Sequence, residues 1–179
     1  MSYAGFWPRA GALLLDVLLW APLVAVHLTI LRGYSISALL VCSLTLGIFG
    51  LAYPIYFHAR WGQTVGKMIT KIRVTHLDGT PIGPKQAILR SSVDLLLWVL
   101  YTPLMLYVLL TSSESAWSSL SAIDRGRLLA ERNPLSGIYE VCEQLWLWSE
   151  LVVLLFNKRR RALHDFIAGT VVIKTGPQP

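Results

Sequence analysis

Long apolar runs alternate with polar connections along the whole sequence. Four of these runs, at about residues 11–31, 36–57, 93–111 and 138–156, are long enough to be considered as membrane spans. A helix that crosses a bilayer needs about 20 mostly apolar residues, whereas a core helix of a soluble protein is usually shorter and has a polar face. The pattern therefore predicts an all-α polytopic membrane protein with four transmembrane helices.

The composition supports this class of protein. Apolar residues make up 54% of the 179 positions, charged residues only 15%, and the mean hydropathy is +0.54. These values lie far from those of ordinary soluble domains. A chain of this length holds about four spans and their connections, so we expect residues 1–179 to form a single membrane domain.

The basic residues are distributed unevenly between the connections. Of the 16 Lys and Arg residues, 12 lie before the first span, in the connection 58–92 or in the tail 157–179. The other 4 lie in the connections on the opposite side, three of them in the loop 112–137. The positive-inside rule places the richer set in the cytoplasm, so both termini should be cytoplasmic and the loop 112–137 outside. We expect a multi-pass protein of the inner or plasma membrane.

The cytoplasmic connection 58–92 is predicted to contain a small β/amphipathic-helix element. Apolar residues spaced by three and four indicate an amphipathic helix at the membrane surface: Val65, Met68, Ile69 and Ile72. Lys67 and Lys71 lie on the flanks of this helix. The next residues, 71–77, alternate as in a strand, and Asp78 with Gly79 forms a turn signal. Residues 168–174 are similarly β-branched, and the two segments could pair beneath the membrane.

The first apolar run contains a carboxylate, Asp16, at a depth where hydrocarbon disfavours charge. An ionisable group there costs at least about 2.5 kcal/mol and should face the protein interior. Arg9 lies two helical turns earlier, about 10 Å along the axis, which is too far for a direct salt bridge. Arg90, at the start of the third run, is the best-placed partner. Asp16 is therefore either half of a structural ion pair or an acid that binds a proton or cation.

The last run is the least apolar because it contains three acids. Glu140, Glu143 and Glu150 recur at helical spacing and share one face. Glu150 is about as deep as Asp16, so the two carboxylates would lie at one level if the first and fourth helices touch. Unless a cation lay between them, one would keep its proton, as in a proton-coupled cation site. Alternatively, the outer glutamates pair with arginines of the loop 112–137, or this face packs on another subunit.

Several short motifs occur in order along the chain: residues 5–16, 62–67, 72–74, 78–81, 89–90 and 160–172. Together they resemble the RDD family of integral membrane proteins over residues 5 to 173. The family is named after an arginine at the start of the first span, an aspartate inside that span and a second aspartate. Arg9 and Asp16 match the first two. The second is matched by Asp165, after His164, or by Asp94. The resemblance implies transport of a small solute, with cation/proton exchange reported for some members.

Other chemistry is not indicated by the sequence. It contains no motif of a zinc protease, nucleophile elbow, phosphate loop or dinucleotide site, so we expect neither enzyme activity nor a cofactor. The four His and two Cys residues lack the spacing of metal ligands. Because the basic residues lie between apolar runs, nucleic acid is not an expected partner. Residues 158–161 should instead contact anionic lipid head groups of the bilayer.

Two function classes remain, with Asp16, Glu150, Glu143 and Asp94 as candidate substrate-binding or ion-binding acids. In the first, the protein transports a small solute or cation coupled to protons. In the second, it is a non-catalytic membrane subunit that assembles or recruits partner proteins. For transport we expect a homo-oligomer, because four short helices form only a thin wall around a pathway. For assembly we expect partner membrane proteins.

Overall fold

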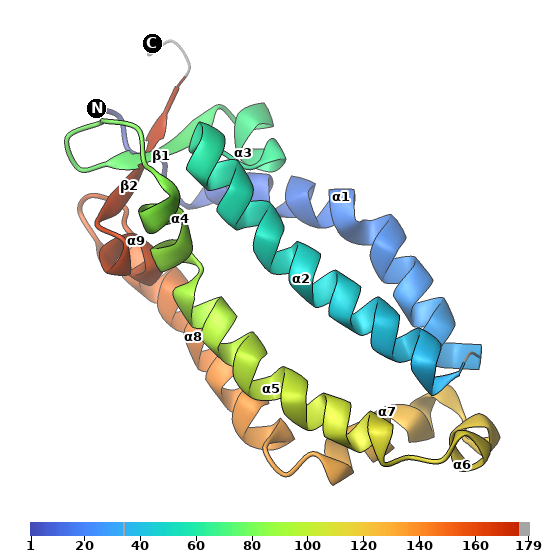
Figure 1. Ribbon diagram of the computed structural model, residues 1–179. Helices are drawn as coiled ribbons and strands as arrows, with labels where there is room; N and C mark the ends of the chain where they lie inside the picture. The colour runs from blue at the N-terminus through green and yellow to red at the C-terminus, as the bar shows by residue number, and fades with distance from the viewer. Residues whose placement is uncertain (34, 176–179) are drawn as a thin grey trace.

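Four long helices dominate the computed structural model, which describes residues 1–33 and 35–175. They are α1 (Phe6–Gly33), α2 (Ile36–Trp61), α5 (Ser92–Leu110) and α8 (Ser136–Phe156). Each contacts the next along the chain, and α8 returns to contact α1. Figure 1 shows α1 and α2 as one neighbouring pair and α5 and α8 as another.

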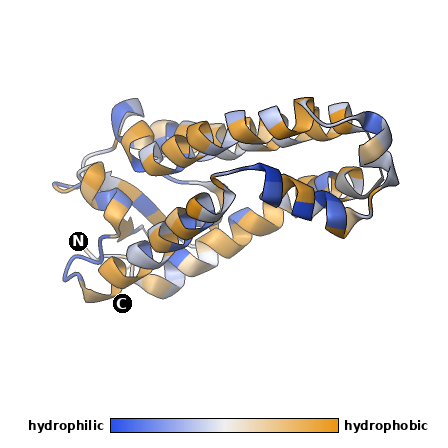
Figure 2. Ribbon diagram, turned by 90° about the horizontal axis from the view of Figure 1, so that it is seen from below, coloured by the Kyte–Doolittle hydropathy of each residue, from blue (hydrophilic) through white to orange (hydrophobic). Residues whose placement is uncertain are grey.

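Three of these helices are long and apolar enough to cross a membrane, judged by length and composition: Phe6–Ile30, Ile36–Trp61 and Ser92–Leu110. In Figure 2, hydrophobic residues extend along the long helices, whereas hydrophilic residues are concentrated in the connections at their ends. The fourth predicted span forms α8, a helix of 21 residues that contains three glutamates. Its crossing of the membrane stays a prediction.

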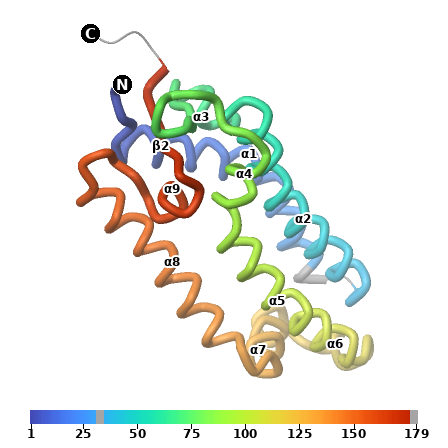
Figure 3. Tube along the Cα trace, turned by 60° about the vertical axis from the view of Figure 1, so that its left-hand side comes forward, coloured from blue at the N-terminus to red at the C-terminus, as the bar shows by residue number. Residues whose placement is uncertain are grey.

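Short elements fill the connections. The connection 58–92 contains α3 (Val65–Ile69), β1 (Ile72–His76) and α4 (Pro84–Arg90). The tail contains α9 (Leu163–Ile167) and β2 (Thr170–Lys174), and its last four residues lie outside the described part of the chain. The loop 112–137 contains α6 (Glu114–Ser119) and α7 (Ala122–Arg132). Figures 1 and 3 agree that α3, α4, α9 and the sheet gather with both termini at one end, opposite α6 and α7.

The two predicted strands do pair. They are antiparallel, with Val74 opposite Val172, and the N-terminal segment joins them because the Ala4 amide donates to the Val172 carbonyl at 2.8 Å. Side chains alternate between the two faces of the sheet, and one face belongs to a buried hydrophobic cluster: Ala4, Ala12, Ile72, Val74, Ile82 and Val172. This cluster joins the N-terminus, the connection 58–92 and the tail into one unit beneath α1.

The amphipathic helix is shorter than expected. The prediction that it includes Ile72 is wrong, because α3 ends at Ile69 and Ile72 begins β1. The cause is local: Lys71 adopts a left-handed backbone with φ of 54°, which no helix continues. Met68 and Ile69 remain exposed on α3, as expected for a helix at a membrane surface.

The loop 112–137 is ordered by a second buried cluster at the far end of the helices. Trp117 of α6 is buried there with Ile36, Leu39 and Leu109. The Arg125 guanidinium of α7 lies 5.4 Å from the centre of the Trp117 ring and donates to the Trp117 carbonyl at 3.0 Å. This cluster holds the ends of α2 and α5 together.

Candidate functional site

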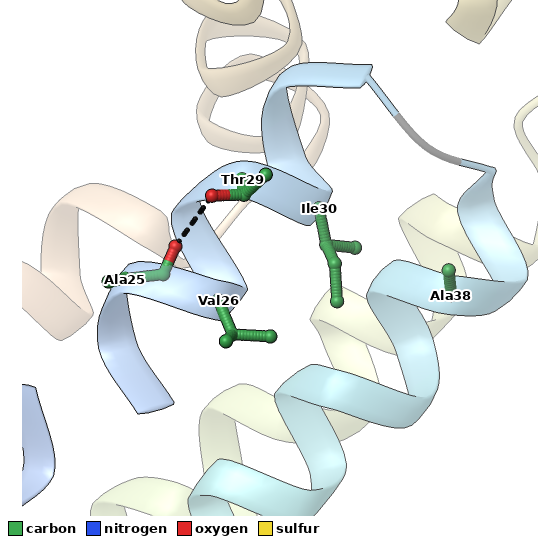
Figure 4. Close-up of a pocket in the computed structure, with 5 residues that line it drawn as sticks. All are labelled: Ala25, Val26, Thr29, Ile30 and Ala38. Atoms are coloured by element: carbon green, nitrogen blue, oxygen red, sulfur yellow. Dashed lines mark hydrogen bonds between the residues drawn. The ribbon is translucent and has the colours of Figure 1, made fainter. Parts of the chain in front are cut away.

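Among the cavities formed by described residues, two that lie against α1 differ in polarity. The first, of about 570 Å³, lies between the end of α1 and the start of α2 (Figure 4). Its polar lining group is the Thr29 hydroxyl, which donates to the Ala25 carbonyl at 2.9 Å. The second, of about 580 Å³, lies between α1 and α8 and includes six titratable residues: Arg9, Asp16, Lys67, Arg90, Glu150 and His164. Charge enclosed by apolar walls makes this α1–α8 cavity the candidate site.

Asp16 is held by neutral donors. Its Oδ1 accepts from the Tyr53 hydroxyl and from the Gly66 amide, each at 2.8 Å, and its Oδ2 accepts from the Thr64 hydroxyl at 2.6 Å. The prediction that Arg90 is the partner of Asp16 is therefore wrong. The carboxylate instead satisfies a free amide of the first turn of α3, where anions are favoured.

Gly66 allows this contact. A Cβ atom at Gly66 would lie 2.0 Å from the Ala12 carbonyl oxygen and 3.0 Å from Asp16 Cγ. Only a residue without a side chain lets α3 approach the backbone of α1 this closely. The glycine thus fixes the depth at which α3 places its amide and Lys67 beside α1.

Asp165 lies at the centre of a buried ionic cluster beneath the cavity. Its Oδ2 accepts from Arg9 Nη1 at 2.7 Å and from the Ala162 amide at 3.0 Å, and its Oδ1 pairs with Arg90. Burial alone would raise the pKa of Asp165, but Arg90, His164 and Arg9 outweigh burial and hold it well below its usual range. The ion pair between Arg9 and Asp165 joins two of the family motifs, which favours Asp165 over Asp94 as the second family aspartate.

Glu150 is tied to α9. Its Oε1 accepts from the His164 backbone amide at 2.8 Å, and its Oε2 contacts His164 Nδ1. Burial, with help from Arg90, lowers the pKa of His164, so the ring is neutral near pH 7. Asp16 and Glu150 therefore line one cavity, as expected if the first and fourth helices touch, but each has its own donors.

The other two candidate acids lie outside the cavity lining. Asp94 accepts from the Trp146 indole at 3.0 Å and so joins α5 to α8. Glu143 is exposed on α8, as is Glu140. Among the described residues, no group of three or more His, Cys, Asp and Glu side chains is placed to hold a metal ion.

Lys67 is the functional candidate that sequence reasoning missed. Its Nζ lies 2.8 Å from His58 Nε2, and burial, with Arg90, lowers its pKa to about 7 against the opposing effect of Asp16. The sequence places it on the flank of a surface helix, where lysines are normally solvated. Its position in the cavity depends on the close approach of α3 to α1, for which Gly66 was the available signal.

Lys67 should make stability rise with pH above neutrality. Because its pKa is depressed in the folded protein, the unfolded chain binds more protons between about pH 7 and the ordinary value of about 10.5. Each pH unit in this window adds at most about 1.4 kcal/mol. We expect the melting temperature in detergent to rise from pH 7 to pH 9 in the wild type and to rise less in Lys67→Met. If the melting temperature rose equally with pH in the wild type and in Lys67→Met, Lys67 would be charged in the folded protein over this range.

Fold and cavity together define a helical membrane protein with charged groups enclosed between its first and last long helices. Residues 3–169 match the model of the RDD family, and the chain belongs to this family. It is also similar to a protein of Bacillus subtilis (strain 168) named "Uncharacterized protein YckC". The two are 24% identical over 175 residues, which cover 97% of this chain and 86% of that protein. No solved structure matches the chain.

Proposed function

We propose that this RDD family protein spans the membrane four times with both termini in the cytoplasm, and that it transports a small solute or cation coupled to protons. The observation that supports transport is the α1–α8 cavity, in which Asp16, Glu150 and Lys67 line one space. A lysine that titrates near pH 7 beside a carboxylate can release its proton when the occupant of the site changes. The plasma membrane location rests on the positive-inside rule.

The topology can be tested with single cysteines in a chain from which both native cysteines are removed. Ser118→Cys and Arg127→Cys should react with an impermeant maleimide added outside intact cells. Thr80→Cys and Thr175→Cys should react only after lysis. Because α8 joins Ser118 to Thr175, this result requires α8 to cross the membrane. Labelling of Thr80→Cys from outside would overturn the orientation.

The transport proposal predicts that two cavity variants lose activity while a neighbouring variant keeps it. Asp16→Asn and Glu150→Gln remove the charges that would exchange protons, so we expect proton movement in proteoliposomes to fall at least about tenfold. Glu140→Gln, an exposed change on the same helix as Glu150, serves as the matched control and should retain the wild-type rate. Activity in both cavity variants would refute the role of these carboxylates.

A second function, assembly with other chains, is favoured by one observation on α8. Glu140 and Glu143 are exposed on this helix. Carboxylates on a spanning helix are unfavourable against lipid and are usually covered by protein or water. A partner membrane protein or a second copy of this chain that covers these acids would account for them without transport.

A further inference from the structure

We propose that the α1–α8 cavity binds a single-chain amphiphile with an acidic head group, of the fatty-acid class, with its head at Arg90 and Lys67 and its chain between α1 and α8. This inference rests on the proposed function, because it names the class of solute that the transport site accepts. Three features of the cavity carry it: an unpartnered donor, two basic side chains and an apolar wall.

The unpartnered donor belongs to Arg90. This residue is 6% exposed and lines the cavity. Its Nη1 donates to Asp165 and to the Thr170 hydroxyl, the latter at 2.7 Å, whereas its buried Nε meets no acceptor within the described part of the chain. A buried N–H without a partner costs free energy, and the Nε edge of a guanidinium suits a two-oxygen acceptor such as a carboxylate. A ligand that supplies these oxygens would satisfy it.

Two basic side chains that line the cavity, Arg90 and Lys67, can face an acidic head group. Arg90 shares its carboxylate partner, Asp165, with Arg9. Lys67 adds a second cation when protonated, and it is close enough to Arg90 for their repulsion to help lower its pKa. The two carboxylates that line the cavity already accept hydrogen bonds from other groups, as described above. An acid head could therefore accept from the Arg90 Nε and from protonated Lys67.

The apolar wall determines what carries the acid head. The remaining lining comes mostly from aliphatic and aromatic side chains of α1 and α8, including Leu13, Leu14, Val17, Leu147, Trp148 and Leu151. Most of these side chains are more than half exposed, so the cavity is open to the surroundings of α1 and α8. Its volume of about 580 Å³ is that of a site for one small ligand. A hydrocarbon chain would bury apolar surface against this wall, whereas a hydrated ion would not.

The test is binding of radiolabelled dodecanoate at pH 7 to the full chain in phosphatidylcholine nanodiscs, with empty nanodiscs as the background. We expect saturable binding above this background, and binding of dodecanol at least about tenfold weaker because it lacks the charged head. Lys67→Gln should weaken dodecanoate binding by about tenfold, and Leu151→Trp should abolish it by filling the cavity. Lys85→Gln, an exposed lysine of α4, should bind as the wild type does.

Several results would overturn the inference. Equal binding of dodecanoate and dodecanol, or unchanged binding in both Lys67→Gln and Leu151→Trp, would show partition into lipid alone. Displacement of dodecanoate by phosphatidylglycerol in the nanodisc would assign the site to a lipid head group instead of a free acid. Because binding is measured without transport, absent binding with intact proton movement would leave the proposed function standing. Binding without proton movement would refute transport and leave the ligand site.

Discussion

Asp165→Ala should produce the largest loss of stability of any single change in the unit formed by the N-terminus, the connection 58–92 and the tail. The substitution leaves Arg9 and Arg90 buried without their shared carboxylate, and it removes the acceptor of the Ala162 amide. Breaking a buried ion pair by removing one partner costs about 3–5 kcal/mol. For a chain of this size we expect the melting temperature in detergent to fall by about 6–20 °C. The yield of folded protein should fall with it.

A matched control uses an exposed aspartate. Asp124 lies on α7 and faces Arg127 at 3.9 Å, with both side chains largely in solvent. Surface pairs of this kind contribute at most about 1 kcal/mol, so Asp124→Ala should melt close to the wild type. If Asp165→Ala also melted normally but lost proton movement, Asp165 would belong to the transport site instead of serving as a tie between α1, α4 and α9.

Gly66→Ala should be the second most damaging change, although it adds one methyl group. The new Cβ would meet the Ala12 carbonyl oxygen at 2.0 Å, so α3 must move away from α1. Overpacking of this kind costs about 1–3 kcal/mol. Because the movement also withdraws the Gly66 amide from Asp16, we expect proton movement to be lost together with stability. Thermal unfolding and the proteoliposome assay on one preparation would measure both effects.

Gly50 provides the control for this change. It lies in α2, and a Cβ atom there would meet nothing within 4 Å beyond the adjacent backbone of its own helix. Gly50→Ala should keep or raise the melting temperature, since alanine favours a helix by up to about 1 kcal/mol over glycine. A Gly66→Ala protein as stable as Gly50→Ala would contradict the packing of α3 against α1.

The long elements of the fold follow from the sequence because their signals are local. Apolar runs of span length produced α1, α2, α5 and α8, and alternating β-branched residues produced β1 and β2. The short helices α4, α6 and α7 were not predicted. They depend on contacts between distant segments, such as the burial of Trp117 against α2 and α5. The end of α3 was misplaced because the left-handed Lys71 carries no glycine signal.

The sequence predicted which acids belong to the candidate site, but it did not predict which residues they pair with. A charge within an apolar run is conspicuous, so Asp16 and Glu150 could be selected, and both line the cavity. The partner of Arg90 could not be deduced, since Arg90 and Asp165 are separated by 75 positions and meet only when α9 packs against α4. Asp16 attracted neutral donors because α3 folds back onto α1, an approach that depends on one glycine. Lys67 was overlooked for the same reason.

Proton movement by the wild-type protein tests the central claim most directly. Purified protein in sealed proteoliposomes with an internal pH dye should show a change of internal pH when a gradient of a transported solute or cation is imposed. Empty liposomes give the background. The account predicts the fastest change near pH 7, where Lys67 titrates. If neither a monovalent cation nor dodecanoate moved protons above the background between pH 5.5 and pH 9, the transport function would be contradicted and assembly with partner chains would be the better explanation.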